Sequence, residues 1–214
     1  SESKTVQGII AESSDNIINV ITRSNKIYSD VFTGLAKQDK SKLKKSKKGV
    51  AKLDAEIEEL RDQIFFFIKK LDETSVRGSS FYITILAYLT DIAQSLEFIS
   101  KKSYKHVNNN HKPLRYSQIN DLKEIDEALS ALLKEIVEIF NERKFEKIGM
   151  VINHKENILN SLSEKIEKQV ARTRTEESSP KNTTLYFNLL LETKELVKGI
   201  MNLMEEYNSS YKKV

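Results

Sequence analysis

Seven lysines gather in one short stretch of the chain, and their spacing could create an anion-binding surface. The stretch KQDKSKLKKSKK covers residues 37–48 and contains Lys37, Lys40, Lys42, Lys44, Lys45, Lys47 and Lys48. Such a run could bind anionic lipid headgroups, phosphate or polyphosphate, since each lysine near an anionic membrane contributes about 1 kcal/mol. A solvated hairpin tip is the alternative. Because Leu43 is its only apolar residue, we expect the stretch to be mobile rather than packed.

The sequence gives little support for catalysis. It has no glycine-rich phosphate loop, no cysteine, and no nucleophile with a base beside it. His106 and His111 are five apart, which is not the spacing of a helical metal site, and His154 stands alone, so we interpret all three as capping or surface residues. Arg172 and Arg174 suit the negative end of a helix dipole, although a phosphate or an acid of a partner would also suit them. We predict that the chain is not an enzyme.

The composition predicts a soluble, strongly helical protein. Only 6 Gly and 2 Pro interrupt 214 residues, 31% of the residues are charged, and Trp is absent. Because 35 Lys plus Arg face 31 Asp plus Glu and no aromatic residue is interleaved with the lysine run, we expect no nucleic-acid partner. No apolar run approaches the roughly 18 residues that cross a bilayer. The lack of cysteine excludes disulfides and thiolate metal sites.

One segment of the chain occurs a second time, 104 positions later (183 minus 79). SSFYITILAYLTDIAQSLEFI begins at Ser79, and TTLYFNLLLETKELVKGIMNL begins at Thr183. Aligned without a gap, the two segments superpose apolar residues at ten places: Phe81 on Leu185, Tyr82 on Tyr186, Ile83 on Phe187, Ile85 on Leu189, Leu86 on Leu190, Ala87 on Leu191, Ile92 on Leu196, Ala93 on Val197, Leu96 on Ile200 and Ile99 on Leu203. An acid also matches an acid, Asp91 on Glu195. The repeat predicts a duplicated helical unit.

Apolar residues recur at helical spacing along the chain, and no segment has a convincing strand pattern. The spacing predicts six long helices, at about 3–36, 53–71, 79–107, 119–140, 152–170 and 183–211. Ser117 is the expected N-cap of the fourth helix, and Pro180 fits the first turn of the sixth.

The polar stretch NNNHKP, residues 108–113, is the best internal boundary of the chain. The repeated segment is then the third helix on each side of this boundary. We therefore predict an all-α fold of two tandem antiparallel three-helix bundles. The first covers residues 1–107 and the second residues 117–214, with a connector at 108–116.

Aromatic residues near the end of the second predicted helix indicate a contact surface. In IFFFI, residues 64–68, the heptad places Ile64, Phe67 and Ile68 toward the bundle, whereas Phe65 and Phe66 point away from it. The two outward rings could form the contact between the bundles, or they could bind a partner protein. The sequence leaves both interpretations open.

Two tandem three-helix bundles with an acid in each third helix resemble the PhoU family of phosphate-uptake regulators. The stretches SLEFISKKSYKHVNNNHKPLRYSQINDLKEIDEAL and KQVARTRTEESSPKNTTLYFNLLLETKELV are similar to the PhoU-like cytoplasmic domain at the C-terminal end of certain bacterial inorganic phosphate transporters. The resemblance implies a cytoplasmic domain at the inner face of the membrane. Its implied partner is the membrane domain of a phosphate transporter in the same full-length chain, which would agree with a sequence that begins without Met.

The resemblance also implies surface metal clusters, of divalent or iron-type ions, held by carboxylates one helical turn apart. The candidate ligands here are Asp91, Glu192 and Glu195. Asp91 has Ala87 at the position one turn earlier, and only Glu192 and Glu195 form a pair. We therefore expect the domain to fold without a cofactor and to bind metal weakly if at all.

Two functions follow as hypotheses. The first is a regulatory or accessory domain of inorganic phosphate transport that acts by contact with the transporter. The second is a helical platform that binds metal or polyphosphate. A homodimer and an anionic membrane surface are further candidate partners.

Overall fold

The structure of the chain is a computed structural model that describes residues 6–68, 76–176 and 179–212. Six long helices account for most of these residues, and no strand occurs among them. The long helices are α1 (Val6–Lys37), α2 (Lys40–Ile68), α3 (Val76–Asn108), α4 (Tyr116–Asn141), α6 (Lys155–Thr175) and α7 (Pro180–Lys212). A short 3-10 helix, η3 (Phe145–Lys147), and the five-residue α5 (Ile148–Ile152) lie between α4 and α6. The all-α prediction is confirmed.

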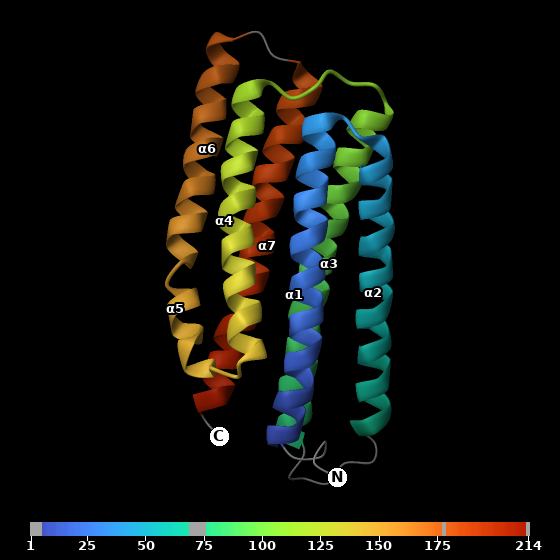
Figure 1. Cartoon of the computed structure of the whole chain (residues 1–214), viewed down its shortest axis with the longest axis vertical. Helices are drawn as coiled ribbons and strands as arrows, with labels where there is room; N and C mark the ends of the chain where they lie inside the picture. Colours follow the sequence, from blue (N-terminus) through green and yellow to red (C-terminus); the bar gives the residue numbers. More distant parts are fainter. Residues whose placement is uncertain (1–5, 69–75, 177–178, 213–214) are drawn as a thin grey trace.

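The helices run up and down in two sets that lie side by side (Figure 1). In the first set α1, α2 and α3 all pack against one another, and in the second α6 and α5 pack against α7. The two sets are joined because α3 packs against α7 and α1 packs against α4. Apolar side chains from both halves thus form one continuous buried core. The division into two domains at residues 108–116 stays a prediction, although this segment does connect α3 to α4.

Burial repeats from α3 to α7 as the aligned segments predict. At eight of the ten aligned places both residues are buried, and the other two pairs also agree: Ile83 and Phe187 are half-buried, Ala87 and Leu191 exposed. The two helices approach each other closely at Gly199, where an added Cβ would lie 3.4 Å from Ile92. The apolar face of each helix therefore points into the core, because burial of apolar surface is the main favourable contribution to the free energy of folding.

The boundaries at two helix starts differ from the predictions. The N-cap of α4 is Arg115, not Ser117, and the Oε1 atom of Gln118 accepts the backbone N–H of Arg115 at 2.9 Å. Pro180 is the first residue of α7, as predicted. The predicted break at residues 72–78 falls largely on residues 69–75, which lie outside the described residues, as do Leu71 and the side chain of Phe67.

The fifth predicted helix, residues 152–170, corresponds to α6, and a turn with two short helices precedes it. A residue with positive φ, Arg143 at 57°, follows α4, and the chain then forms η3 and α5 before α6 begins at Lys155. Phe145 anchors this turn, since its ring lies 5.5 Å from that of Phe140 and 5.1 Å from that of Tyr207.

None of the helices in the described part of the chain is long and apolar enough to span a membrane.

Candidate functional site: a lysine groove and a buried polar network

The lysine run is helical, so the prediction of a mobile tip is wrong. Gln38 turns the chain with a φ of 51°, and Asp39 then caps α2 by accepting the backbone N–H of Lys42 at 3.0 Å. Leu43 is fully buried against Gly34 of α1, where an added Cβ would lie only 2.8 Å from the leucine side chain. A cap and one well-packed leucine therefore hold a segment whose composition alone favours disorder.

Leu43 and Ser46 lie on the buried face of α2, so most lysines of the run lie on its other faces. Lys47 lies over the ring of Tyr104 on α3, with its Nζ 4.4 Å from the ring centre, which is a cation–π contact. Lys37, Lys40, Lys44, Lys45 and Lys48 are exposed, and none of them has an ion-pair partner among the described residues. The structure thus presents most of the run to solvent from a fixed helical framework.

A surface groove lies between α1 and the start of α2, and we call it the lysine groove. Its volume is about 480 Å³. Most of its lining residues are charged or polar: Arg23, Lys26, Ile27 and Asp30 from α1, Asp39 from the turn, and Ser41, Lys42, Lys45, Ser46 and Gly49 from α2. Sequence reasoning singled out Lys42 and Lys45 but missed Arg23 and Lys26. Their membership depends on the packing of α1 against α2.

The acids of the lysine groove are already engaged. The Asp30 carboxylate forms an ion pair with the Lys26 Nζ at 2.6 Å and lies 3.7 Å from the Lys42 Nζ. The carboxylate of Asp39 serves as the helix cap. Arg23 pairs with Glu56, which lies on α2 outside the lining. Four cationic side chains therefore face two carboxylates in the groove.

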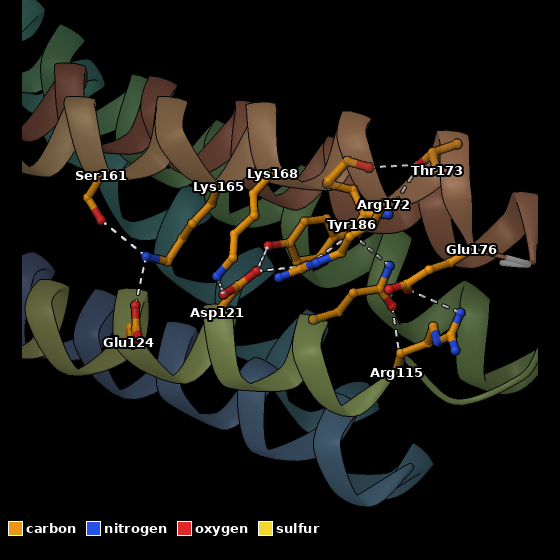
Figure 2. A network of polar contacts seen from close by, with 12 residues as sticks. Arg115, Asp121, Glu124, Ser161, Lys165, Lys168, Arg172, Thr173, Glu176 and Tyr186 are labelled. Atoms are coloured by element: carbon orange, nitrogen blue, oxygen red, sulfur yellow. Dashed lines mark hydrogen bonds and ion pairs between the residues drawn. The ribbon is translucent and has the colours of Figure 1, made fainter.

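A second basic cluster lies in the other half of the molecule, between α4, α6 and α7, and we call it the Asp121 network. Asp121 of α4 is only 4% exposed, and its Oδ2 accepts the Tyr186 hydroxyl at 2.7 Å. The Arg172 guanidinium of α6 lies 3.0 Å from the same oxygen, and the Lys168 Nζ lies 3.5 Å from Oδ1 (Figure 2). The structure therefore decides the question left open for Arg172: it binds an acid of its own chain.

Other polar groups extend the Asp121 network along α6 (Figure 2). The Lys165 Nζ pairs with Glu124 at 2.8 Å and with the Ser161 hydroxyl at 3.3 Å. Gln169 is buried and its Oε1 accepts from Arg172 at 3.3 Å and from Gln118 at 3.4 Å. Lys165 and Gln169 thus face inward on α6, whereas Val170, at the end of the fifth predicted helix, is 49% exposed.

Burial perturbs several titratable groups near these clusters. It raises the pKa of Tyr186, and the hydrogen bond to Asp121 acts in the same direction. Burial also raises the pKa of Asp126, against the hydrogen bond that it accepts from Ser29 at 2.7 Å. At the end of α3, burial lowers the pKa of His106, whose Nε2 lies 3.0 Å from the carbonyl oxygen of Lys112. His106 is therefore a buried residue rather than a surface one.

The three candidate metal ligands lie on α3 and α7 but do not form a donor set. Asp91 and Glu195 are exposed, Glu192 is half-buried, and Lys198 pairs with Glu195 at 3.3 Å. In the described residues no group of three His, Cys, Asp or Glu side chains is placed to hold a metal ion. A multinuclear cluster needs several carboxylates around it to offset the dehydration of the ions. These side chains do not fit such a cluster.

The outward aromatic residues lie at the opposite end of α2 from the lysine groove. Phe65 is 48% exposed and Phe66 is 60% exposed, and Ile68 and Val76 beside them are also exposed. Since α2 packs against α1 and α3, both in its own half, the structure does not place the two rings between the bundles. Ile68 was expected to face inward and does not. A partner contact remains the prediction for Phe65 and Phe66.

Two three-helix sets joined through α3 and α7 define a PhoU-like domain. The chain is similar in structure to the phosphate transport system regulatory protein PhoU from Streptococcus pneumoniae, with a TM-score of 0.78 over 98% of each chain and 12% sequence identity. No family model matches the sequence. No curated protein matches it either. The similarity establishes the fold, and the role of the chain is a matter for proposal.

Proposed function

We propose that this chain is a regulatory or accessory domain of inorganic phosphate transport that acts by contact with the membrane domain of a phosphate transporter. The observation that carries the proposal is the PhoU fold, which extends over 98% of this chain and of the phosphate transport regulator. In this proposal the domain lies at the cytoplasmic face of the membrane, performs no catalysis, and has its effect by binding.

The aromatic end of the first bundle is the proposed contact surface. It consists of Phe65, Phe66 and Ile68 at the end of α2 and Val76 at the start of α3. A shallow groove of about 310 Å³, lined by Ile68, Val76, Ser79, Ser80, Ile83 and Thr84, adjoins these side chains. Large apolar side chains gathered at one place on a surface are a common feature of protein contact sites, because their burial against a partner is favourable.

Phosphate uptake by cells that produce the transporter, with and without this chain, tests the proposal. We expect the chain to change the uptake rate and a Phe65→Ser, Phe66→Ser variant to lose this effect. The matched control is Val170→Ser, Leu191→Ser, because those two side chains are 49% and 51% exposed on other helices. Both variants should keep the stability of the parent, since they alter exposed positions.

Two results would count against the proposed function. One is an uptake rate that the chain does not alter, and the other is an aromatic variant that acts like the parent. If the aromatic variant instead converts a dimer to a monomer in solution, the surface serves a second copy of the chain. The alternative, a helical platform that binds metal or polyphosphate, stays a hypothesis, and its anion-binding part is argued below.

A further inference from the structure

The charge of this chain is concentrated at one end of the first bundle. Residues 37–48 hold seven lysines against one aspartate, a net charge of +6, whereas the whole chain carries +4. The rest of the chain is therefore net negative. A cluster of this kind creates a local positive potential that attracts anions.

Folding alone does not account for the position of these lysines. Lys37 ends α1, where a cation is favourable, but the other six occupy the first turns of α2, where the helix dipole is positive and acids are favourable. The first turn of α2 nevertheless contains no acid. Lys40, Lys44 and Lys48 also follow one another at intervals of four, a spacing at which like charges destabilise a helix. The arrangement costs the folded domain stability that a bound anion would restore.

The lysine groove offers this anion a concave, polar site. Arg23 and Lys26 on one wall face Lys42 and Lys45 on the other. Arg23 pairs with Glu56, and Lys26 and Lys42 share the single carboxylate of Asp30, so the cations of the groove outnumber its acids. Lys45 has no ion-pair partner in the described part of the chain. Lysine and arginine are the side chains that bind phosphate oxygens through charge-assisted hydrogen bonds.

The geometry points to a soluble anion with several linked phosphate groups as the ligand: we propose that such an anion binds in the lysine groove and extends along the exposed lysines of α2. Successive turns of α2 present Lys40, Lys44 and Lys48 about 6 Å apart, so several phosphates could be contacted at once. The run has no exposed apolar side chain to insert into a bilayer, because Leu43 is buried, which favours a free anion over a lipid surface.

Binding by the purified chain to tripolyphosphate, pyrophosphate and orthophosphate, measured by calorimetry, tests the proposal without any transporter. Its outcome is thus independent of the proposed function. We expect affinity to rise with the number of phosphates and to fall with added salt. A Lys42→Gln, Lys45→Gln variant should bind tripolyphosphate about tenfold more weakly. A Lys123→Gln, Lys147→Gln control, which removes the same charge from exposed sites elsewhere, should bind as the parent does.

A chemical measurement avoids reliance on the variants. Lysine acylation followed by mass spectrometry should show that tripolyphosphate protects Lys42 and Lys45 while Lys123 and Lys147 react as before. Equal loss of affinity in both variants would overturn the proposal, since net charge and not the groove would then govern binding. Equal affinity for orthophosphate would overturn it as well. Binding to vesicles that contain anionic lipid, without binding to tripolyphosphate, would assign the groove to lipid headgroups instead.

Discussion

The two basic clusters of this molecule use similar side chains for different purposes. In the Asp121 network, Arg172 and Lys168 converge on one buried carboxylate, and Tyr186 completes its hydrogen bonds. In the lysine groove, cations outnumber acids and Lys45 has no ion-pair partner in the described part of the chain. In the groove, Arg23 and Lys42 also pair with acids across α1 and α2, whereas Lys45 is available to an external anion.

The duplication gives this contrast a structural origin. Tyr82 and Tyr186 are equivalent residues of the repeat, and each bonds to the first helix of its own half. Tyr82 accepts a neutral hydrogen bond from Asn16 at 2.5 Å, whereas Tyr186 donates to the charged Asp121 at 2.7 Å. A carboxylate in the second half requires nearby cations, which α6 supplies. At the equivalent place the first half presents the neutral Asn16 to Tyr82.

The largest expected effect comes from breaking the Asp121 network. An Arg172→Leu change leaves a buried carboxylate with one less cation, so we expect a loss of about 2 to 3 kcal/mol in the free energy of unfolding. Thermal melting should show a fall of roughly 5 to 10 °C. Arg174→Leu is the matched control, because Arg174 is exposed on the same helix, and it should change little.

A double-variant cycle separates the ion pair from the rest of the side chain. Adding Asp121→Asn to Arg172→Leu removes the orphaned charge while an amide oxygen can still accept the Tyr186 hydroxyl. We expect the double variant to be more stable than the sum of the single losses by at least about 1 kcal/mol. Additive losses would mean that Arg172 contributes packing and not charge.

The next effect has the opposite sign and concerns the lysine run. Lys40→Gln, Lys44→Gln and Lys48→Gln together should raise the free energy of unfolding by about 1 kcal/mol, because they relieve repulsion between like charges and an unfavourable helix dipole. Chemical unfolding in low salt measures the gain, which should shrink as salt is added. Lys105→Gln, in the last turn of α3, should instead destabilise slightly. A loss of stability in the triple variant would show that the lysines support the fold.

A smaller effect concerns pH and His106, which belongs to neither basic cluster. The pKa of His106 is lowered in the folded chain by burial, with the His111 ring 5.1 Å away acting in the same direction, against hydrogen bonds to Lys112 and Asn182. The unfolded state therefore takes up a proton more readily. Stability should be fully present above pH 6.5 and should fall as the pH drops from 6.5 toward the lowered folded pKa.

Melting temperatures between pH 7.5 and 5.5 check this sign. A His106→Gln variant should have a shallower pH dependence than the parent, while His154→Gln, at an exposed site, should follow the parent. If the melting temperature of the His106 variant depends on pH as steeply as that of the parent, other groups cause the pH dependence. The lysines of the lysine groove stay charged throughout this range, so a change in tripolyphosphate binding over it would reflect ionisation of the phosphate groups.

Apolar periodicity predicted the helices well because it reports which face each helix buries. The ten aligned pairs of α3 and α7 agree in burial for this reason. Periodicity could not reveal the Asp121 network, since Asp121 and Arg172 are 51 positions apart. The sequence also does not distinguish a charged residue on the surface from one in a buried ion pair. Lys165 and Gln169 likewise face inward on α6, where an apolar stripe was expected.

The lysine run was misjudged because composition reports average behaviour and not individual contacts. Its order depends on Asp39, which caps α2, and on Leu43, which fits against Gly34 of α1. The Asp39 cap is local, three residues from Lys42, whereas the contact of Leu43 with Gly34 forms only when α1 and α2 pack together. The lysine groove was missed for the same reason, because half of its cations come from α1.

Metal removal should have the smallest effect of all. Asp91 lacks a carboxylate one turn earlier, and Glu195 pairs with Lys198 at 3.3 Å, so a cation at these residues would have to displace a lysine and lose water for few ligands. We therefore expect the same melting temperature with and without EDTA, and no stoichiometric metal by elemental analysis of protein purified without a chelator. A fall in melting temperature with EDTA that disappears in a Glu192→Ala, Glu195→Ala variant would contradict this. It would mean that cations bind α7 in spite of its lysines, and that the contrast between paired and available charge must include the acids as well.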